Sequence, residues 1–191
     1  MSEAARRVPT FEALYAEIEA LPQGVTGEIL EPGVIRAMSR PGKPHRGAAR
    51  RLLRALDGFD ANVGGRGWWI EVEAEIRLGD RLVVPDLAGW RVERVAELPD
   101  ENPLTVVPDW ACEILSPSTQ RDDRVVKLPL YMERGVAHAW LVDPALRVVE
   151  VYEPQRGRPL LVQTAVDDAV VTLAPFDAPL ALAAWWLPPP A

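Results

Sequence analysis

Residues 84–86 read Val-Pro-Asp and residues 110–119 read Trp-Ala-Cys-Glu-Ile-Leu-Ser-Pro-Ser-Thr. Each stretch places one acid, Asp86 or Glu113, in an apolar segment that is typical of a buried strand. An ionised carboxylate there is costly unless it is paired or bound to a metal. If the two strands are neighbours, both carboxylates can project toward one point, as hard cations such as Mg²⁺ or Mn²⁺ require. The alternative is that Glu113 points outward from an exposed strand and that Asp86 is a turn or bulge residue.

A lysine follows the Glu113 segment on a predicted helix, which covers residues 120–134. Asp123, Lys127 and Tyr131 are spaced four apart and therefore share one face of this helix. In one interpretation Asp123 and Lys127 form an ordinary intrahelical ion pair. In the other, the ammonium of Lys127 reaches the two acids, orients water and stabilises charge that develops on a phosphorane.

The rest of the chain alternates between helical and strand patterns. Helices are predicted after the N-cap Thr10 and from Pro44 to about Asp57. Strands are predicted as a hairpin from Gly27 to Met38 and at residues 68–78, 82–90, 136–142, 148–152, 159–165 and 169–173. Strands with helices before and after them predict an α/β fold, a single domain with a central mixed β-sheet flanked by helices.

The charge of the chain is uneven. The net charge is -7, which argues against a general nucleic-acid binder, yet residues 36–54 contain seven bases and no acid. Such a segment can face phosphate or can be a solvated helix face. In the first case the contacts to nucleic acid would come from Arg40, Lys43, His45, Arg46 and Arg50. For His45 the alternative is a surface or capping role.

Composition limits the setting of the protein. The chain has 191 residues, which suits one domain, and its single cysteine, Cys112, cannot form an intrachain disulfide. We therefore expect a reduced, cytoplasmic environment. No apolar stretch approaches the ~20 residues of a membrane span, and the N-terminus lacks a secretory signal, so no membrane association is expected. The tryptophans are expected to fill core and interface, and the pairs Trp68-Trp69 and Trp185-Trp186 are also large enough for a contact between two copies, which allows a homodimer.

Several motifs in a fixed order resemble one known family. They are Gly27-Glu28-Ile29-Leu30, Met38-Ser39 with His45, Val84-Pro85-Asp86-Leu87, residues 112–119, Asp123-Arg124 with Lys127 and Tyr131, and Gly135-Val136 through residues 140–144. The chain resembles the Uma family of restriction-endonuclease-like proteins, a branch of the PD-(D/E)XK nuclease superfamily. The resemblance covers about residues 25–153, and residues 154–191 would add the last strands and a tail to a single domain of residues 1–191.

The resemblance implies a restriction-endonuclease-like fold and a set of site residues. Asp86 and Glu113 would be the catalytic, metal-binding acids, and Glu28 would complete the metal site, although Glu28 can also be read as an exposed hairpin acid. Leu115 stands where the superfamily has a lysine, and in this family the lysine moves to the next helix, which maps onto Lys127. The expected function is a Mg²⁺- or Mn²⁺-dependent DNA endonuclease that hydrolyses phosphodiester bonds. The alternative is a catalytically silent relative that binds nucleic acid or protein, which the missing lysine and the acidic net charge favour.

Overall fold

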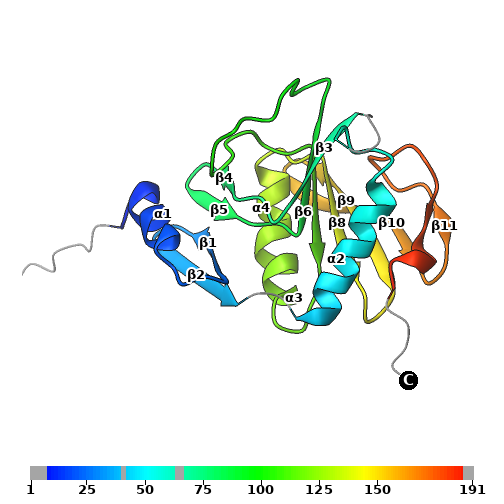
Figure 1. Cartoon of the computed structure of the whole chain (residues 1–191), viewed down its shortest axis with the longest axis horizontal. Helices are drawn as coiled ribbons and strands as arrows, with labels where there is room; N and C mark the ends of the chain where they lie inside the picture. The colour runs from blue at the N-terminus through cyan, green and yellow to red at the C-terminus, as the bar shows by residue number, and fades with distance from the viewer. Residues whose placement is uncertain (1–7, 40–41, 63–66, 187–191) are drawn as a thin grey trace, which may run out of the picture.

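A computed structural model of the protein describes residues 8–39, 42–62 and 67–186 of the chain. It contains a six-stranded sheet, a four-stranded sheet and a small two-stranded hairpin, with helices packed against the two larger sheets (Figure 1). The helical segments are α1 (Phe11–Glu19), α2 (Lys43–Leu56), α3 (Gln120–Asp122), η1 (Asp123–Lys127), α4 (Leu128–Glu133) and η2 (Leu182–Ala184). The strands are β1 (Val25–Glu31), β2 (Val34–Ser39), β3 (Trp68–Val72), β4 (Ile76–Leu78), β5 (Arg81–Val83), β6 (Leu87–Arg91), β7 (Trp110–Ile114), β8 (His138–Asp143), β9 (Val148–Gln155), β10 (Arg158–Val166), β11 (Val170–Val171) and β12 (Leu180–Ala181).

The six-stranded sheet is the centre of the fold. Its order is β10-β9-β8-β7-β6-β3, with β7 and β8 parallel and the other neighbours antiparallel, so the sheet is mixed. On one face, Leu52 of α2 joins a core in which Phe176 packs against Trp110 and Trp140, with ring centroids 5.1 and 5.4 Å apart. On the other face, α4 buries apolar side chains such as Leu128 against the sheet. The predicted fold class, an α/β fold with a central mixed sheet flanked by helices, is confirmed.

The four-stranded sheet carries the N-terminal part of the chain in the order β2-β1-β5-β4. Helix α1 begins after Thr10, whose hydroxyl accepts the N–H of Ala13 at 3.3 Å, as its N-cap sequence predicts. Leu14 and Ile18 of α1 are buried with Ile29 in a separate apolar cluster on this sheet. The predicted hairpin of β1 and β2 is also present.

Two predicted strands are each divided between the two sheets, which corrects the single strands expected at residues 68–78 and 82–90. The first ends at Val72 and resumes at Ile76, with Glu73 at a φ of 51° and its N–H donating to the Asp86 carbonyl. The second is interrupted between Val83 and Leu87, where Pro85 cannot donate to a ladder. Apolar and polar residues keep alternating across the first break, so periodicity does not reveal it, whereas at the second break Pro85 interrupts an apolar run that does not alternate. Both breaks lie at the junction of the sheets and place Asp86 there.

The helix predicted over residues 120–134 is present, but its middle part is a π-helical turn, η1. Pro129 follows this turn and has no N–H to donate to the preceding turn of helix, which accounts for the local widening. Gly135, with a φ of 90°, ends the helix as expected. Asp123 and Lys127 are both buried on the side that faces the junction.

Candidate functional site

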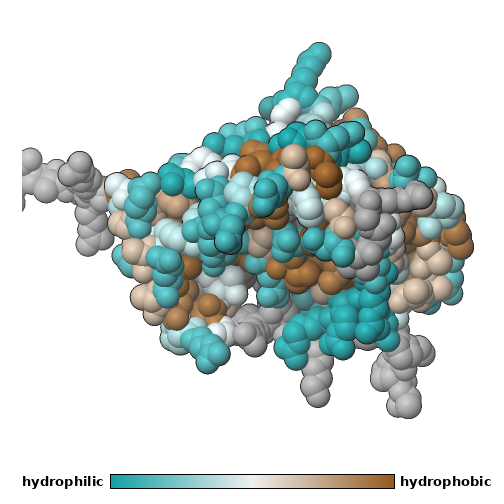
Figure 2. Space-filling view, turned by 45° about the horizontal axis from the view of Figure 1, so that its top comes forward, coloured by the Kyte–Doolittle hydropathy of each residue, from teal (hydrophilic) through white to brown (hydrophobic). Residues whose placement is uncertain are grey.

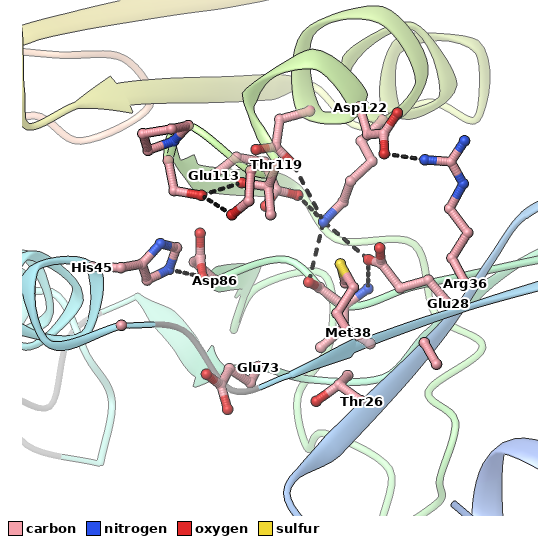
Figure 3. A pocket seen from close by; sticks show the side chains of 18 residues that line it. Thr26, Glu28, Arg36, Met38, His45, Glu73, Asp86, Glu113, Thr119 and Asp122 are labelled. Carbon is pink, nitrogen blue, oxygen red and sulfur yellow. Dashed lines mark hydrogen bonds and ion pairs between the residues drawn. The ribbon is translucent and has the colours of Figure 1, made fainter.

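A pocket of about 740 Å³ lies between the two sheets. Its walls come from β1 and β2, the beginning of α2, the β5–β6 junction, the end of β7 with the following Ser-Pro-Ser-Thr loop, and the helix after that loop. Figure 3 shows Glu28, Asp86 and Glu113 pointing into this one pocket from three different elements. The sequence predicts that Asp86 and Glu113 converge if their two strands are neighbours. Strands β6 and β7 are neighbours and pair antiparallel.

Asp86 is held by hydrogen bonds through both carboxylate oxygens. The backbone N–H of Ile114 donates to Oδ2 at 2.6 Å, and His45 Nε2 lies 2.6 Å from Oδ1. Burial alone lowers the pKa of His45, but the bond to Asp86 and the charges of Asp86, Asp123 and Glu73 outweigh burial and raise it. A proton on His45 is therefore favoured, and Asp86 is fixed between α2 and β7.

Glu113 is enclosed by the core of the domain, with 3% of its surface exposed. Its Oε1 accepts a hydrogen bond from the Tyr131 hydroxyl and lies 2.8 Å from Lys127 Nζ. Burial raises the pKa of Glu113 well above its usual value, an effect that the charge of Lys127 opposes and the charges of Asp123 and Asp86 add to. The reading of Glu113 as an outward-pointing strand residue is inconsistent with this burial.

Lys127 connects Glu113 to the N-terminal hairpin. Its ammonium lies 3.0 Å from Glu28 Oε1 and donates to the carbonyl of Val84 at 3.2 Å. Glu28 itself is 1% exposed, and its Oε1 also accepts the Val84 N–H at 2.8 Å. Burial lowers the pKa of Lys127, but Glu113 and Glu28 together raise it well above the usual value, so the side chain stays charged. Glu28 is thus a buried partner of Lys127 rather than an exposed hairpin acid.

Asp123 is a pocket residue that the sequence did not assign to the site. It is 4% exposed, and its Oδ1 lies 4.0 Å from Lys127 Nζ. Burial raises its pKa to about 6, although Lys127 and a hydrogen bond from Thr119 act in the opposite direction. The spacing of Asp123 and Lys127 is the available signal, and it places Asp123 on the same helix face as Lys127 without giving it a role in the site.

The pocket holds more negative than positive charge. Its charged and titratable wall residues are the acids Glu28, Glu73, Asp86, Glu113, Asp122 and Asp123 and the bases Arg36, His45 and Lys127. If all six acids are ionised, they exceed the three bases by at least three charges, and carboxylate oxygens are the donors that hard divalent cations take. The donor chemistry therefore fits Mg²⁺ or Mn²⁺.

The side chains as they stand are not arranged as a complete ligand set. Across residues 8–39, 42–62 and 67–186, no group of three or more His, Cys, Asp or Glu side chains is placed to hold a metal ion. The ammonium of Lys127 lies between Glu28 and Glu113 and engages an oxygen of each. Lys127 contacts Oε1 of Glu28 and of Glu113 alike, so a metal that takes either of these oxygens would require Lys127 to move.

Comparison with known proteins places the chain in a family. The family model described as "Uma2: Putative restriction endonuclease" matches residues 9–186, well over half of the sequence. The chain belongs to the Uma2 family. The crystal structure of a putative nuclease from Anabaena variabilis matches with a TM-score of 0.72 and 23% identity, over 93% of this chain and 97% of that one. At this identity the likeness shows the fold alone, and a search of curated proteins finds no relative.

The basic segment of this Uma2 family member divides into two parts. His45 faces Asp86 in the pocket, whereas Arg46 and Arg50 are exposed on α2. Arg40 lies outside the described residues, and the side chain of Lys43 is not described. A further base of the same segment, Arg36 on β2, lines the pocket and forms an ion pair with Asp122 across it (Figure 3).

The tryptophan pairs of this Uma2 chain do not form an exposed contact surface. Trp68, Trp185 and Trp186 are at most 6% exposed and belong to the core between α2 and the six-stranded sheet. Trp69 is partly buried, and its indole N–H donates to the Val95 carbonyl at 2.8 Å. The expected role of these pairs in a dimer contact is therefore wrong, because the fold uses them internally. Within the described part of the chain, every helix is too short or too polar to cross a membrane.

Proposed function

We propose that this Uma2 family member is a divalent-metal-dependent endonuclease that hydrolyses phosphodiester bonds of DNA with Mg²⁺ or Mn²⁺. The family description, restriction endonuclease, supports a nuclease-like function, and the similar crystal structure is that of a putative nuclease. The observation that carries the proposal is the meeting of Asp86, Glu113 and Lys127 in one pocket from separate elements. Two acids and a charged lysine in a partly enclosed pocket are suited to positioning a phosphate and stabilising its transition state.

Each residue has a distinct part in this proposal. Asp86 and Glu113 would hold the cation, which when bound supplies a water of lowered pKa and neutralises charge on the phosphate. His45 and the Ile114 N–H keep Asp86 oriented, and the Tyr131 hydroxyl does so for Glu113. Lys127 remains protonated and places its ammonium next to Glu113 and Glu28, where it can donate to a phosphate oxygen or to water.

Two further parts of the proposal are that the chain acts as a single functional unit and that it works in a reducing compartment. Residues from the N-terminal hairpin and from the six-stranded sheet line the same pocket, so we propose that the chain acts as one domain. The one cysteine, Cys112, is buried and free, which suits a cytoplasmic protein.

Metal-dependent cleavage is the test of this function. Purified protein is incubated with supercoiled plasmid and with single-stranded DNA in the presence of Mg²⁺, Mn²⁺ or EDTA. We expect nicking or cutting with either metal and none with EDTA, and calorimetric titration with Mn²⁺ should give saturable heat. Absence of cleavage and of Mn²⁺ binding would contradict the proposal.

The exposed bases of α2 are proposed to contact the DNA backbone. Figure 2 shows a hydrophilic surface where α2 begins, and Arg46 and Arg50 are exposed there. Replacing both with Ala should weaken DNA binding and flatten the log–log salt dependence by about one unit per lost phosphate contact. Fluorescence anisotropy over a series of salt concentrations measures this slope. The matched control is Arg134→Ala, on the opposite side of the six-stranded sheet. An unchanged slope in the α2 variant would show that this face of α2 is solvated and does not contact phosphate.

A catalytically silent binding protein is the second candidate. The contact of Lys127 with both Glu28 and Glu113 favours it, because this ion pair network satisfies the acids without a metal. In that case DNA or protein binding would persist while Mn²⁺ titration gives no heat, so the same calorimetry separates the two functions.

A further inference from the structure

The β10 strand forms an exposed apolar edge of the six-stranded sheet. It is the last strand in the sheet order and pairs only with β9 in the described part of the chain. Four of its side chains are between 41% and 49% exposed: Leu160, Leu161, Val162 and Val166. We call these four, together with Leu146 and Val170, the β10 edge.

Leu146 and Val170 extend the same patch. Leu146 is 70% and Val170 is 68% exposed. The first lies beside Arg147, whose carbonyl accepts the Asp167 N–H at 2.9 Å, and the second follows Ala169, whose N–H donates to the Val166 carbonyl at 3.3 Å. In Figure 2 apolar atoms gather on the side of the molecule where Figure 1 places β10 and β11. Exposed apolar side chains gathered along one edge of a sheet are typical of an interaction surface.

The β10 edge has the pattern of an internal strand rather than of an edge strand. Leu161 is paired with Tyr152 and Leu160 with Glu153, so these two neighbouring leucines lie on opposite faces of the sheet. Apolar residues on both faces are typical of strands whose two faces are both covered. An unpaired strand of this kind is a template for another strand.

The charges around β10 are self-complementary. Exposed Arg156 and Arg158 lie at its beginning, and exposed Asp167 and Asp168 directly follow its end, where Asp168 is paired with Arg147 of the same chain and Asp167 is the acid that can face a second copy. Two copies of the strand in antiparallel orientation place the basic end of one beside the acidic end of the other, twice about a two-fold axis. A foreign strand would have to reproduce this arrangement, whereas a second copy supplies it.

We propose that β10 packs antiparallel against β10 of a second copy of this chain, forming a homodimer in which the two six-stranded sheets join. Pro159, which has no N–H, and a bulge between Leu161 and Gln163 interrupt the backbone ladder between the two strands. Apolar contacts of the β10 edge then provide most of the interface, and the Arg and Asp ends fix its orientation.

Sedimentation velocity over about a hundredfold range of protein concentration tests this dimer, because its population must rise with concentration. Leu161→Lys should raise the dimer dissociation constant by about tenfold or more, since it places a charge in the centre of an apolar contact. The matched control is Val34→Lys, an exposed valine on β2, the edge strand of the other sheet. Circular dichroism confirms that each variant is folded.

A charge exchange gives a second readout that does not depend on the apolar change. Arg158→Asp should weaken the dimer, and adding Asp167→Lys should restore it, because opposite charges again meet across the axis. A wild type that stays monomeric at every concentration would overturn the proposal. So would a dimer that Leu161→Lys leaves intact, or one that Val34→Lys weakens equally.

Discussion

Asp86→Asn should slow DNA cleavage by at least about a thousandfold while the fold is retained. The metal contribution to transition-state charge stabilisation is several kcal/mol, and each 1.36 kcal/mol is about a factor of ten in rate. The amide has the size of the carboxylate and can still accept the Ile114 N–H and bond to His45. The loss would therefore report the missing charge and metal ligand rather than a collapsed pocket. Single-turnover cleavage with Mg²⁺ measures it.

The two histidines of the chain provide a readout of the same variant without activity. Burial is the largest single effect on the pKa of His45 and lowers it. Among the groups that raise this pKa, Asp86 acts most strongly, through its hydrogen bond and its charge. In Asp86→Asn the pKa of His45 should therefore fall below its usual value, whereas that of His138, which burial lowers, should not move. An NMR titration of the two imidazoles resolves both.

A second carboxylate serves as the control for Asp86→Asn. Asp109 accepts the Arg91 N–H and pairs with Arg94 outside the pocket, so Asp109→Asn removes a similarly bonded charge. Equal loss of cleavage in both variants, or wild-type cleavage in Asp86→Asn, would remove Asp86 from the chemistry.

The sequence predicts the two acids because their neighbours are apolar. Asp86 and Glu113 stand out since a charge in a buried strand needs a partner, and pairing of β6 with β7 then brings them together. The division of the long strands is not predictable in the same way. Alternation continues through Glu73 although the two halves of the first strand join different sheets, and Pro85 marks a break in the second without showing that the chain changes sheet. That division creates the pocket between the sheets.

Partners that are distant in the chain are harder to predict than the acids themselves. The charge pattern groups His45 with Arg46 and Arg50, and the family motif that includes His45 does not give its partner, yet His45 bonds to Asp86 and the arginines are exposed. Similarly, the contact of Lys127 with Glu28 depends on how the N-terminal hairpin lies against the helix after β7. Such contacts follow from the arrangement of elements and not from local pattern.

Lys127→Met should lower both stability and cleavage. The methionine retains an apolar side chain of similar length but leaves Glu28 and Glu113 buried without their cation. Removing one partner of a buried ion pair costs about 3–5 kcal/mol of unfolding free energy. Cleavage should fall by about a hundredfold, comparable to the loss of one preorganised donor. Denaturant unfolding and single-turnover cleavage of the folded variant measure the two effects.

The stability loss in Lys127→Met should depend on pH in a direction set by Glu113. Burial raises the pKa of Glu113 in the folded protein, and Lys127 is the charge that opposes this rise. A carboxyl whose folded pKa is raised stabilises the fold most below its usual pKa of 4.5, and this contribution is lost as the pH rises through the folded pKa. The variant should therefore approach wild-type stability in acid and lose most above neutrality. A loss that is independent of pH would mean that the buried carboxylates are not its cause.

Removing a second charge separates the structural role of Lys127 from its chemical role. Glu28→Gln added to Lys127→Met should recover part of the stability, because one uncompensated carboxylate is gone, but it should not recover cleavage. Lys127→Arg should keep the ion pairs and restore cleavage only in part, since a planar guanidinium cannot place a donor at the same point.

Mn²⁺ should stabilise Lys127→Met more than wild type if the cation binds the carboxylates that the ammonium otherwise compensates. Equal stabilisation of both proteins would place the metal away from Glu28 and Glu113, and wild-type cleavage by folded Lys127→Met would confine this lysine to a structural role.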